Sequence, residues 1–270
     1  LAHDADSRVF CYADGQLQKA EQNDAILQFV AYWEQRTGQV PRELIFDSKL
    51  TTYANLNRLN QRGIEFITLR RRSPKMLATL ARLPASAWRR IALQNVARAY
   101  RRPRVLDDTI HLTGYDGPLR QLTVADLGHE EPTFLVTNQL RRATSTLIER
   151  YAQRMVIENS IADGIDFFHM DALSSAVAMK ITCDLQLTLM ASSLYRLLGA
   201  RVGRGYEVAK GRHIFRDFID AVGLITLFDD VIQVQYQKRA HNPLLIAAGF
   251  GTTDVPVPWL GNKRLRFVFG

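Results

Sequence analysis

Three side chains near the middle of the chain have types and a spacing that could do chemistry together. In the stretch ERYAQRMVIENSIADG, Tyr151, Arg154 and Glu158 follow one another at intervals of three and four residues. Side chains at these intervals project from one side of an α-helix, because each residue turns the helix by about 100°. The other side is left to the apolar residues Met155, Ile157 and Ile161. The pattern predicts a helix that presents a ring, a base and an acid together.

Glu158 needs a cationic partner under this interpretation. We expect it to lie deep in the apolar helix, where an unpaired carboxylate costs several kcal/mol. A metal ion would satisfy it. So would Arg154, since an i, i+4 ion pair is the simplest alternative and contributes ~0.3–0.5 kcal/mol when exposed. Tyr151 favours a functional site, because its ring can stack on a base while the guanidinium holds a phosphate.

Asp47 is a second candidate for chemistry. It ends the apolar run LIFD, where the chain leaves a predicted strand. In parallel α/β sheets, ligands and metals are held at this carboxyl edge of the strands. The alternative is that Asp47 caps the following helix, a role for which Ser48, Thr51 and Thr52 compete.

A basic cluster follows the next predicted strand. The segment TLRRRSPK contains Arg70, Arg71, Arg72 and Lys75. Such a cluster, at the same carboxyl edge as Asp47, suits the phosphodiester of a nucleic acid. The alternative is a solvated loop without a ligand.

The elements that position these residues form a strand, helix, strand unit. Strands are predicted at 43–47 and 64–70, with a helix over 51–63 between them. Two strands joined in this way are parallel. Upstream, 8–14 has the composition of a further strand, and the apolar stripe of 23–38 predicts a helix. The region therefore has the pattern of an α/β domain.

The middle of the chain is rich in arginine and then in β-forming residues. The stretch 84–104 is basic, and its pattern does not reveal its fold. Turn residues from Tyr115 to Pro118 predict a hairpin between two β-rich runs, and 132–138 predicts a further strand. The arginines of the basic stretch are Arg89, Arg90, Arg98, Arg101, Arg102 and Arg104.

Two long helices are predicted beyond this region. One runs from about 141 to 164, and the other from about Leu173 to Leu198, ended by Gly199. Residues 201–270 mix a short helix with the β-rich runs VIQVQYQ and RLRFVFG.

The composition favours a polyanionic partner. The 270 residues carry 35 basic and 27 acidic side chains, a net charge of +8, and because seven of the 35 are lysines, 28 are arginines. A guanidinium makes forked hydrogen bonds to phosphate that an ammonium cannot make. The alternative is a basic but ordinary enzyme. Two distant cysteines and the lack of a long apolar run are typical of a cytosolic protein.

These motifs resemble those of a known family. The segment LIFDSKLTTYANLNRLNQRGIEFITLRRRS, followed 111 residues after Asp47 by RYAQRMVIENSI, is similar to the bacterial insertion-sequence transposases of the DDE type, which have an RNase H-like core. In that family the last core helix carries Tyr-x2-Arg-x3-Glu-x6-Lys. Tyr151, Arg154 and Glu158 match the first three places, and Ile165 stands where the lysine belongs.

The resemblance implies a site and its partners. Asp47 and Glu158 correspond to the second and third acidic residues of the family triad, so they would be catalytic residues and ligands of Mg²⁺, for which Mn²⁺ can substitute. The metal would activate a water or a 3′-hydroxyl for in-line attack on DNA. A homodimer would pair the two transposon ends in the bacterial cytoplasm, at the nucleoid. Double-stranded DNA would be bound by Tyr151, Arg154, Arg70, Arg71 and Arg72.

The resemblance also implies a domain organisation. It predicts an α/β fold with an RNase H-like core, an inserted β-rich module and long C-terminal helices. The first triad aspartate would lie upstream of residue 1, since the chain opens without methionine, so we expect a truncated sequence. The expected parts are the N-terminal part of the core at 1–82, the module at 83–138, the core-completing helices at 139–200 and a C-terminal region at 201–270.

Two alternatives stay open. One is a catalytically incomplete DNA-binding remnant of a transposase, which Ile165 and the missing first aspartate favour. The other is an α/β enzyme acting on a phosphorylated small molecule, which would explain Asp47 and the basic loop but not the number of arginines. Salt separates them, because DNA binding weakens steeply with salt and small-ligand binding far less.

Overall fold

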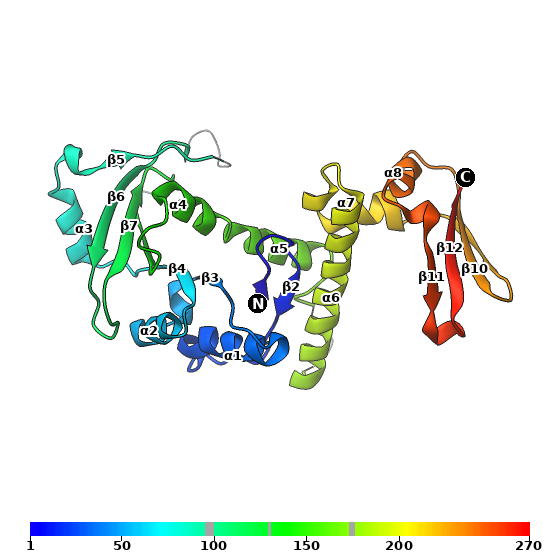
Figure 1. The fold of residues 1–270 in the computed structure, drawn as a ribbon, viewed down its shortest axis with the longest axis horizontal. Coiled ribbons are helices and arrows are strands. Elements are labelled where there is room, and N and C mark those ends of the chain that lie inside the picture. Colours follow the sequence, from blue (N-terminus) through cyan, green and yellow to red (C-terminus); the bar gives the residue numbers. More distant parts are fainter. Residues whose placement is uncertain (95–99, 129–130, 173–175) are drawn as a thin grey trace. The chain divides into compact units, whose positions relative to one another are not determined.

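The chain folds into two compact units of mixed α/β structure, which confirms the predicted fold class (Figure 1). The computed structural model describes residues 1–94, 100–128, 131–172 and 176–270. The first unit comprises Gln16–Val156, and the second joins Leu1–Gly15 to Ile157–Gly270. These boundaries differ from those of the four predicted parts. Arg98 and Leu173, named in the sequence predictions, lie outside the described residues.

A six-stranded mixed sheet forms the centre of the Gln16–Val156 unit. Its strand order is β3-β4-β8-β7-β6-β5. β3 and β4 are parallel, as predicted for the strand, helix, strand unit, and the other neighbours are antiparallel. The strands are β3 (Glu43–Phe46), β4 (Glu65–Leu69), β5 (Arg89–Arg90), β6 (Arg104–Ile110), β7 (Leu119–Ala125) and β8 (Thr133–Thr137).

The strands expected in an inserted module extend this same sheet. The predicted hairpin is confirmed, since β6 and β7 pair from Arg104 with Ala125 to Ile110 with Leu119. β8 then pairs with both β7 and β4, and Leu135 stands opposite Leu69. The β-rich segment and the parallel pair are therefore one continuous layer.

Helices cover the sheet and close its core. Leu147 and Ile148 of α4 pack against sheet residues that include Ile67, Val105 and Leu122, all of them buried. Burial of such side chains is the main favourable term in folding. The helices of this unit are α1 (Ala25–Thr37), α2 (Tyr53–Gln61), α3 (Pro74–Ala81) and α4 (Thr144–Ala152).

The helix predicted from about 141 to 164 is broken, so that prediction was wrong in this respect. α4 ends at Ala152, and α5 (Met155–Asp166) begins after a turn. In the turn, the Arg154 N–H donates to the carbonyl of Tyr151, as in a tight turn rather than an α-helix. The chain passes from one compact unit to the other directly after this turn.

The predicted strand at 8–14 takes no part in the six-stranded sheet, so its assignment to the α/β core was wrong. Only Phe10–Tyr12 is extended, as β2, and it pairs with β1 (Ala2–His3) in a separate two-stranded sheet. Both strands belong to the second unit. Strand composition predicts an extended chain but not its partner.

The second long helix was predicted to end at Gly199, and this prediction was wrong. α6 runs from Ala178 to Val202, and Gly203 is its C-cap. A Cβ atom at Gly199 would lie 2.4 Å from the carbonyl oxygen of Tyr206. The glycine therefore lets the following turn approach the helix, while the helix ends one turn later.

A four-stranded sheet completes the second unit (Figure 1), and its β-rich runs confirm the prediction for VIQVQYQ and RLRFVFG. A small core of Val202, Ile214, Phe218 and Leu245 lies beside it. No helix among the described residues has the length and apolar character needed to cross a membrane. In order the strands are β11 (Asp254–Val257), β12 (Lys263–Phe269), β10 (Val231–Tyr236) and β9 (Gly223–Leu227), and the remaining helices are α7 (Gly211–Ile214) and α8 (Asn242–Ala247).

Candidate nucleic-acid interface

Nine basic residues of the first unit lie at one edge of the six-stranded sheet, the edge at which β3 and β4 end. Because Phe46 pairs in parallel with Thr68, Asp47 and Arg70 leave β3 and β4 at the same edge. The antiparallel pairing of β6 with β7 places the start of β6 there too, beside the end of β7. We call this surface the arginine edge, and its basic residues are Arg70, Arg71, Arg72, Lys75, Arg89, Arg90, Arg101, Arg102 and Arg104.

The basic stretch that the sequence left without a fold is part of this edge. The Ile91 N–H donates to the Pro103 carbonyl at 3.1 Å, and the Leu93 N–H donates to the Arg101 carbonyl at 2.9 Å. These bonds continue the β5 and β6 ladder beyond the sheet, so that its two arms run side by side. The arginines of both arms therefore project near one another.

Carboxylates partly neutralise the edge and fix some of its arginines, and one of them, Asp107, accepts a hydrogen bond from Arg89 at 3.1 Å. Arg104 donates to both oxygens of Asp126, at 2.9 and 3.0 Å, and Arg72 lies 2.8 Å from Glu131. The hydrogen bonds from Arg104 lower the pKa of Asp126 and outweigh the effect of burial. The side chains of the Arg104–Asp126 and Arg72–Glu131 pairs are at least one third exposed, so these two pairs contribute little stability.

Arg70 and Arg71 behave differently although they are neighbours. The Arg70 N–H donates to the carbonyl of Phe134, and its guanidinium donates to Gln121 at 2.7 Å, so Arg70 is held against the sheet. Arg71 is exposed. A phosphate approaching this edge would therefore reach Arg71 more easily than Arg70.

Aromatic rings lie among the basic residues. The Arg104 guanidinium lies 5.5 Å from the ring centroid of Trp88, which is within the range of a cation–π contact. Tyr100 is 39 % exposed and lies next to Gly128. Arginines interleaved with aromatic rings are typical of surfaces that bind nucleic acid. Charge and rings together make this edge the best candidate interface.

Asp47 caps a short helix at this edge, which was the alternative given for it. Its Oδ1 accepts a hydrogen bond from the Lys49 N–H at 2.9 Å and lies 3.4 Å from the Ser48 hydroxyl. Thr52 caps α2 instead. Capping uses one carboxylate oxygen, and the other suits monodentate binding of a hard cation such as Mg²⁺. Capping and metal binding are thus compatible at Asp47.

Tyr151 and Arg154 meet as predicted, although not on one continuous helix. The Arg154 guanidinium lies 5.6 Å from the ring centroid of Tyr151. The Tyr151 ring is half-buried and packs against the core between α4 and the sheet. Packing of this kind gives Tyr151 a structural role in addition to the predicted contact with a base.

Glu158 is exposed, so the prediction that it lies deep in an apolar helix was wrong. It stands in the first turn of α5, where Met155 is exposed as well, at 61 %. The buried face of α5 consists instead of Ser160, Asp163 and Gly164. The polar face is buried because Asp163 accepts the Gly211 N–H at 2.9 Å and pairs with Arg196 at 3.5 Å.

Asp47 and Glu158 belong to different compact units. In the described parts of the chain, no group of three or more His, Cys, Asp or Glu side chains is gathered closely enough to hold a metal ion. Each carboxylate suits Mg²⁺ by its chemistry. Their joint action on a metal stays a prediction from the sequence.

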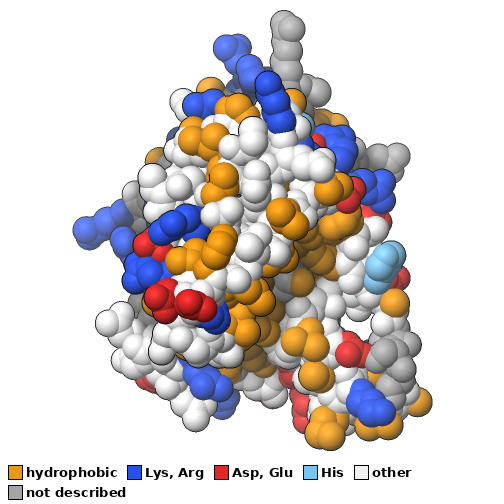
Figure 2. All heavy atoms as spheres, turned by 90° about the vertical axis from the view of Figure 1, so that its right-hand side faces the viewer, with side chains coloured by type: hydrophobic (Ala, Val, Ile, Leu, Met, Phe, Trp, Pro, Cys, Tyr) orange, Lys and Arg blue, Asp and Glu red, His pale blue; other side chains and the backbone are white. Residues whose placement is uncertain are grey.

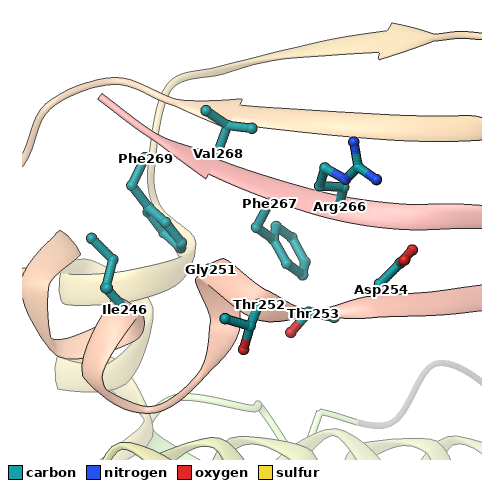
Figure 3. A pocket seen from close by; sticks show the side chains of 9 residues that line it. All are labelled: Ile246, Gly251, Thr252, Thr253, Asp254, Arg266, Phe267, Val268 and Phe269. Atoms are coloured by element: carbon teal, nitrogen blue, oxygen red, sulfur yellow. The ribbon is translucent and has the colours of Figure 1, made fainter.

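A shallow hollow of about 530 Å³ lies in the second unit, between α8 and β12 (Figure 3). Phe267 and Phe269 line it from β12, together with Ile246 of α8, and Arg266 and Asp254 stand at one end. None of the predicted site residues lines it. It is a surface of the small core of this unit.

No family model matches the sequence, and no curated protein matches it.

Sequence reasoning missed the second half of the arginine edge. Arg89, Arg90, Arg101, Arg102 and Arg104 were noted as a basic stretch but were not named as binding residues. Their signal was the alternation of arginines with Trp88 and Tyr100. The sequence pattern did not predict the antiparallel pairing of β5, β6 and β7, which places these arginines at the edge where Arg70 lies.

Proposed function

We propose that this protein acts on DNA as a transposase of the DDE type, with the arginine edge as a principal DNA-binding surface. The observation that carries the proposal is the position of Asp47 at the same sheet edge as nine basic residues. Among the described residues, three further carboxylates, Asp107, Asp126 and Glu131, contact these basic residues. A polyanion suits such an excess of guanidinium groups, and a mononucleotide-sized ligand would use only a few of them.

In this proposal the residues have separate roles. The exposed arginines of the edge hold phosphates, and Trp88 and Tyr100 contact sugar or unstacked bases. Asp47 and Glu158 supply carboxylate oxygens to Mg²⁺, which when bound activates a nucleophile for attack on a phosphodiester. Tyr151 and Arg154 contact the transposon end. The protein works in the bacterial cytoplasm at the nucleoid, as a homodimer that holds two ends.

A second candidate is a DNA-binding protein without catalysis. It needs no metal at Asp47 or Glu158, and the capping contact gives Asp47 a structural role without one. It shares the arginine edge with the first candidate and differs only in the chemistry.

Incubation with supercoiled plasmid that carries the element's ends, with and without Mg²⁺, separates the two candidates. The transposase predicts metal-dependent nicks at the ends, abolished by Glu158→Gln with DNA binding retained. Binding without nicks in Mg²⁺ or Mn²⁺ would favour the second candidate. Absence of binding would overturn both.

A further inference from the structure

The edge strand β9 has the composition of a strand from the middle of a sheet. The run VGLITLF at 222–228 contains no charged residue. Continuous apolar runs are typical of strands buried on both faces, with neighbours on both sides. Yet among the described strands β9 pairs only with β10, at the end of the four-stranded sheet. Leu224, Ile225 and Leu227 are 63, 66 and 68 % exposed. Figure 2 shows hydrophobic side chains at the surface on one face of the molecule.

The opposite edge of the same sheet is protected against further pairing. β11 contains Pro256, which has no N–H to donate. Its first residue, Asp254, is covered by Arg264, which donates to the Asp254 carboxylate at 2.7 Å and to its carbonyl at 3.0 Å. Proline and charge are the usual means by which proteins block an edge strand. The contrast between the two edges indicates that β9 is kept open for a partner strand.

The hydrogen-bonding groups of β9 that point away from β10 can be assigned. The Phe228 N–H donates to the Val231 carbonyl and the Gln237 N–H to the Val222 carbonyl, so even-numbered residues of β9 bond to β10. Because the direction alternates along an antiparallel strand, the N–H and C=O groups of Gly223, Ile225 and Leu227 point outward.

These outward groups are self-complementary. If a second β9 runs antiparallel with Ile225 opposite its own copy, Gly223 of each strand stands opposite Leu227 of the other. Each outward residue then exchanges its N–H and C=O with an outward residue of the partner. Ile225 then meets its own copy, and every other contact occurs twice, as a two-fold interface requires.

The charges at the two ends of β9 fit the same arrangement. Asp229 and Asp230 form the turn after β9, where Lys263 donates to the carbonyls of Phe228 and Asp229. At the other end Lys238 and Arg239 follow Gln237, beside Val222. With Lys263 counted at the acidic end and Asp220 at the basic end, the first end is still net acidic and the second net basic. An antiparallel partner brings each acidic end to a basic end.

We propose that two copies of this chain associate through β9, by antiparallel pairing centred on Ile225, to form one continuous sheet across a two-fold axis. The occupant is a second copy because both the outward hydrogen-bonding groups and the terminal charges of β9 complement themselves. The inference concerns this surface alone, and it holds whether or not the protein acts on DNA.

The test uses the full chain and sedimentation equilibrium over a range of concentrations. The wild type is expected to dimerise. Ile225→Pro removes the central outward N–H from both copies. The dimer dissociation constant should rise at least about tenfold, because two hydrogen bonds across the two-fold axis are lost. Ile225→Val keeps the N–H and should dimerise as the wild type does. Far-ultraviolet circular dichroism checks that each variant is folded.

A charge exchange provides a second test that leaves the strand intact. Asp229→Lys and Lys238→Asp should each weaken the dimer, and the double variant should restore it. Within one copy these residues lie at opposite ends of β9, roughly 20 Å apart, so the rescue can only act between copies. A monomeric wild type, a dimer that Ile225→Pro leaves unchanged, or a double variant as weak as its parents would each overturn the proposal.

Discussion

Asp47 directly follows the last residue of β3, and Arg70 directly follows the last residue of the neighbouring parallel strand β4. The two residues therefore stand at the same edge of the six-stranded sheet. Asp47 is turned into a capping contact with the Lys49 N–H, while Arg70 is tied to Gln121. Both side chains are therefore held in place before any ligand arrives. A fixed acid beside an excess of arginines is the arrangement that the proposed action on DNA needs.

Replacement of Asp47 by asparagine should separate its two roles. Asparagine caps a helix as well as aspartate does. The free energy of unfolding of Asp47→Asn should therefore lie within about 0.5 kcal/mol of the wild-type value. It is a much poorer ligand for Mg²⁺ than a carboxylate, and metal-dependent nicking should fall at least about 100-fold. Plasmid nicking and urea unfolding measure the two effects. Asp116→Asn, on the loop between β6 and β7, should leave both unchanged, and full nicking by Asp47→Asn would exclude Asp47 as a ligand.

Glu43 should be the carboxylate that contributes most to the stability of the first unit. Its side chain is 9 % exposed, and it accepts hydrogen bonds from Arg150 at 2.6 Å and Gln139 at 2.8 Å. Burial alone raises the pKa of Glu43, but the hydrogen bonds from Arg150 and Gln139 and the charges of Arg150 and Arg142 outweigh it, and the pKa is lowered. Glu43→Gln should cost about 3 kcal/mol of unfolding free energy at neutral pH.

The same network predicts a pH dependence. A carboxyl whose pKa is lower in the folded than in the unfolded protein contributes stability above its ordinary pKa of 4.5, and this contribution is lost as the pH falls through the folded value. The stability difference between wild type and Glu43→Gln should therefore shrink below about pH 4.5. Urea unfolding followed by tryptophan fluorescence measures it. Glu65, opposite Glu43 in the register but 43 % exposed, provides the control, and Glu65→Gln should cost less than ~1 kcal/mol. Equal losses of unfolding free energy in Glu43→Gln and Glu65→Gln would contradict the stabilising role assigned to Glu43.

Two helical glycines of the second unit should respond to alanine in opposite ways. At Gly199 a methyl group would lie 2.4 Å from the Tyr206 carbonyl oxygen, so Gly199→Ala should destabilise the protein by ~1–3 kcal/mol. At Gly164 it would meet the flexible Met170 side chain at 3.4 Å, and Gly164→Ala should be neutral or stabilise by up to ~1 kcal/mol through helix propensity. Thermal unfolding followed by circular dichroism compares them. A harmless Gly199→Ala would mean that the turn at Tyr206 can move away.

The parts of the fold that the sequence predicted are those decided by neighbours along the chain. The parallel pair around α2 followed from a strand, helix, strand spacing, and the hairpin of β6 and β7 followed from turn residues near Gly117. Gly38 adopts the left-handed conformation expected of a helix C-cap. Each of these features depends on local backbone preferences.

The features that the sequence did not predict depend on distant partners. The break between α4 and α5 carries neither glycine nor proline, and it occurs where the two helices join different cores. Gly199 has the pattern of a helix end, yet its position is set by the approach of Tyr206. The same distinction holds for the site. Local rules predicted that Asp47 and Arg70 lie at one edge, whereas the position of Arg104 at that edge depends on the pairing of β6 with β7.

The most direct test of the proposed function is the salt dependence of binding to a fluorescent duplex, measured by anisotropy. If the arginine edge contacts phosphates, the slope of log K against log salt should shrink by about 0.9 for each phosphate contact removed, and therefore by nearly 2 for the double variant Arg71→Gln, Arg102→Gln. Arg42→Gln, Arg141→Gln changes two exposed arginines at the opposite edge of the sheet and should keep the wild-type slope. Equal slopes for all three proteins would contradict the assignment of DNA binding to the arginine edge.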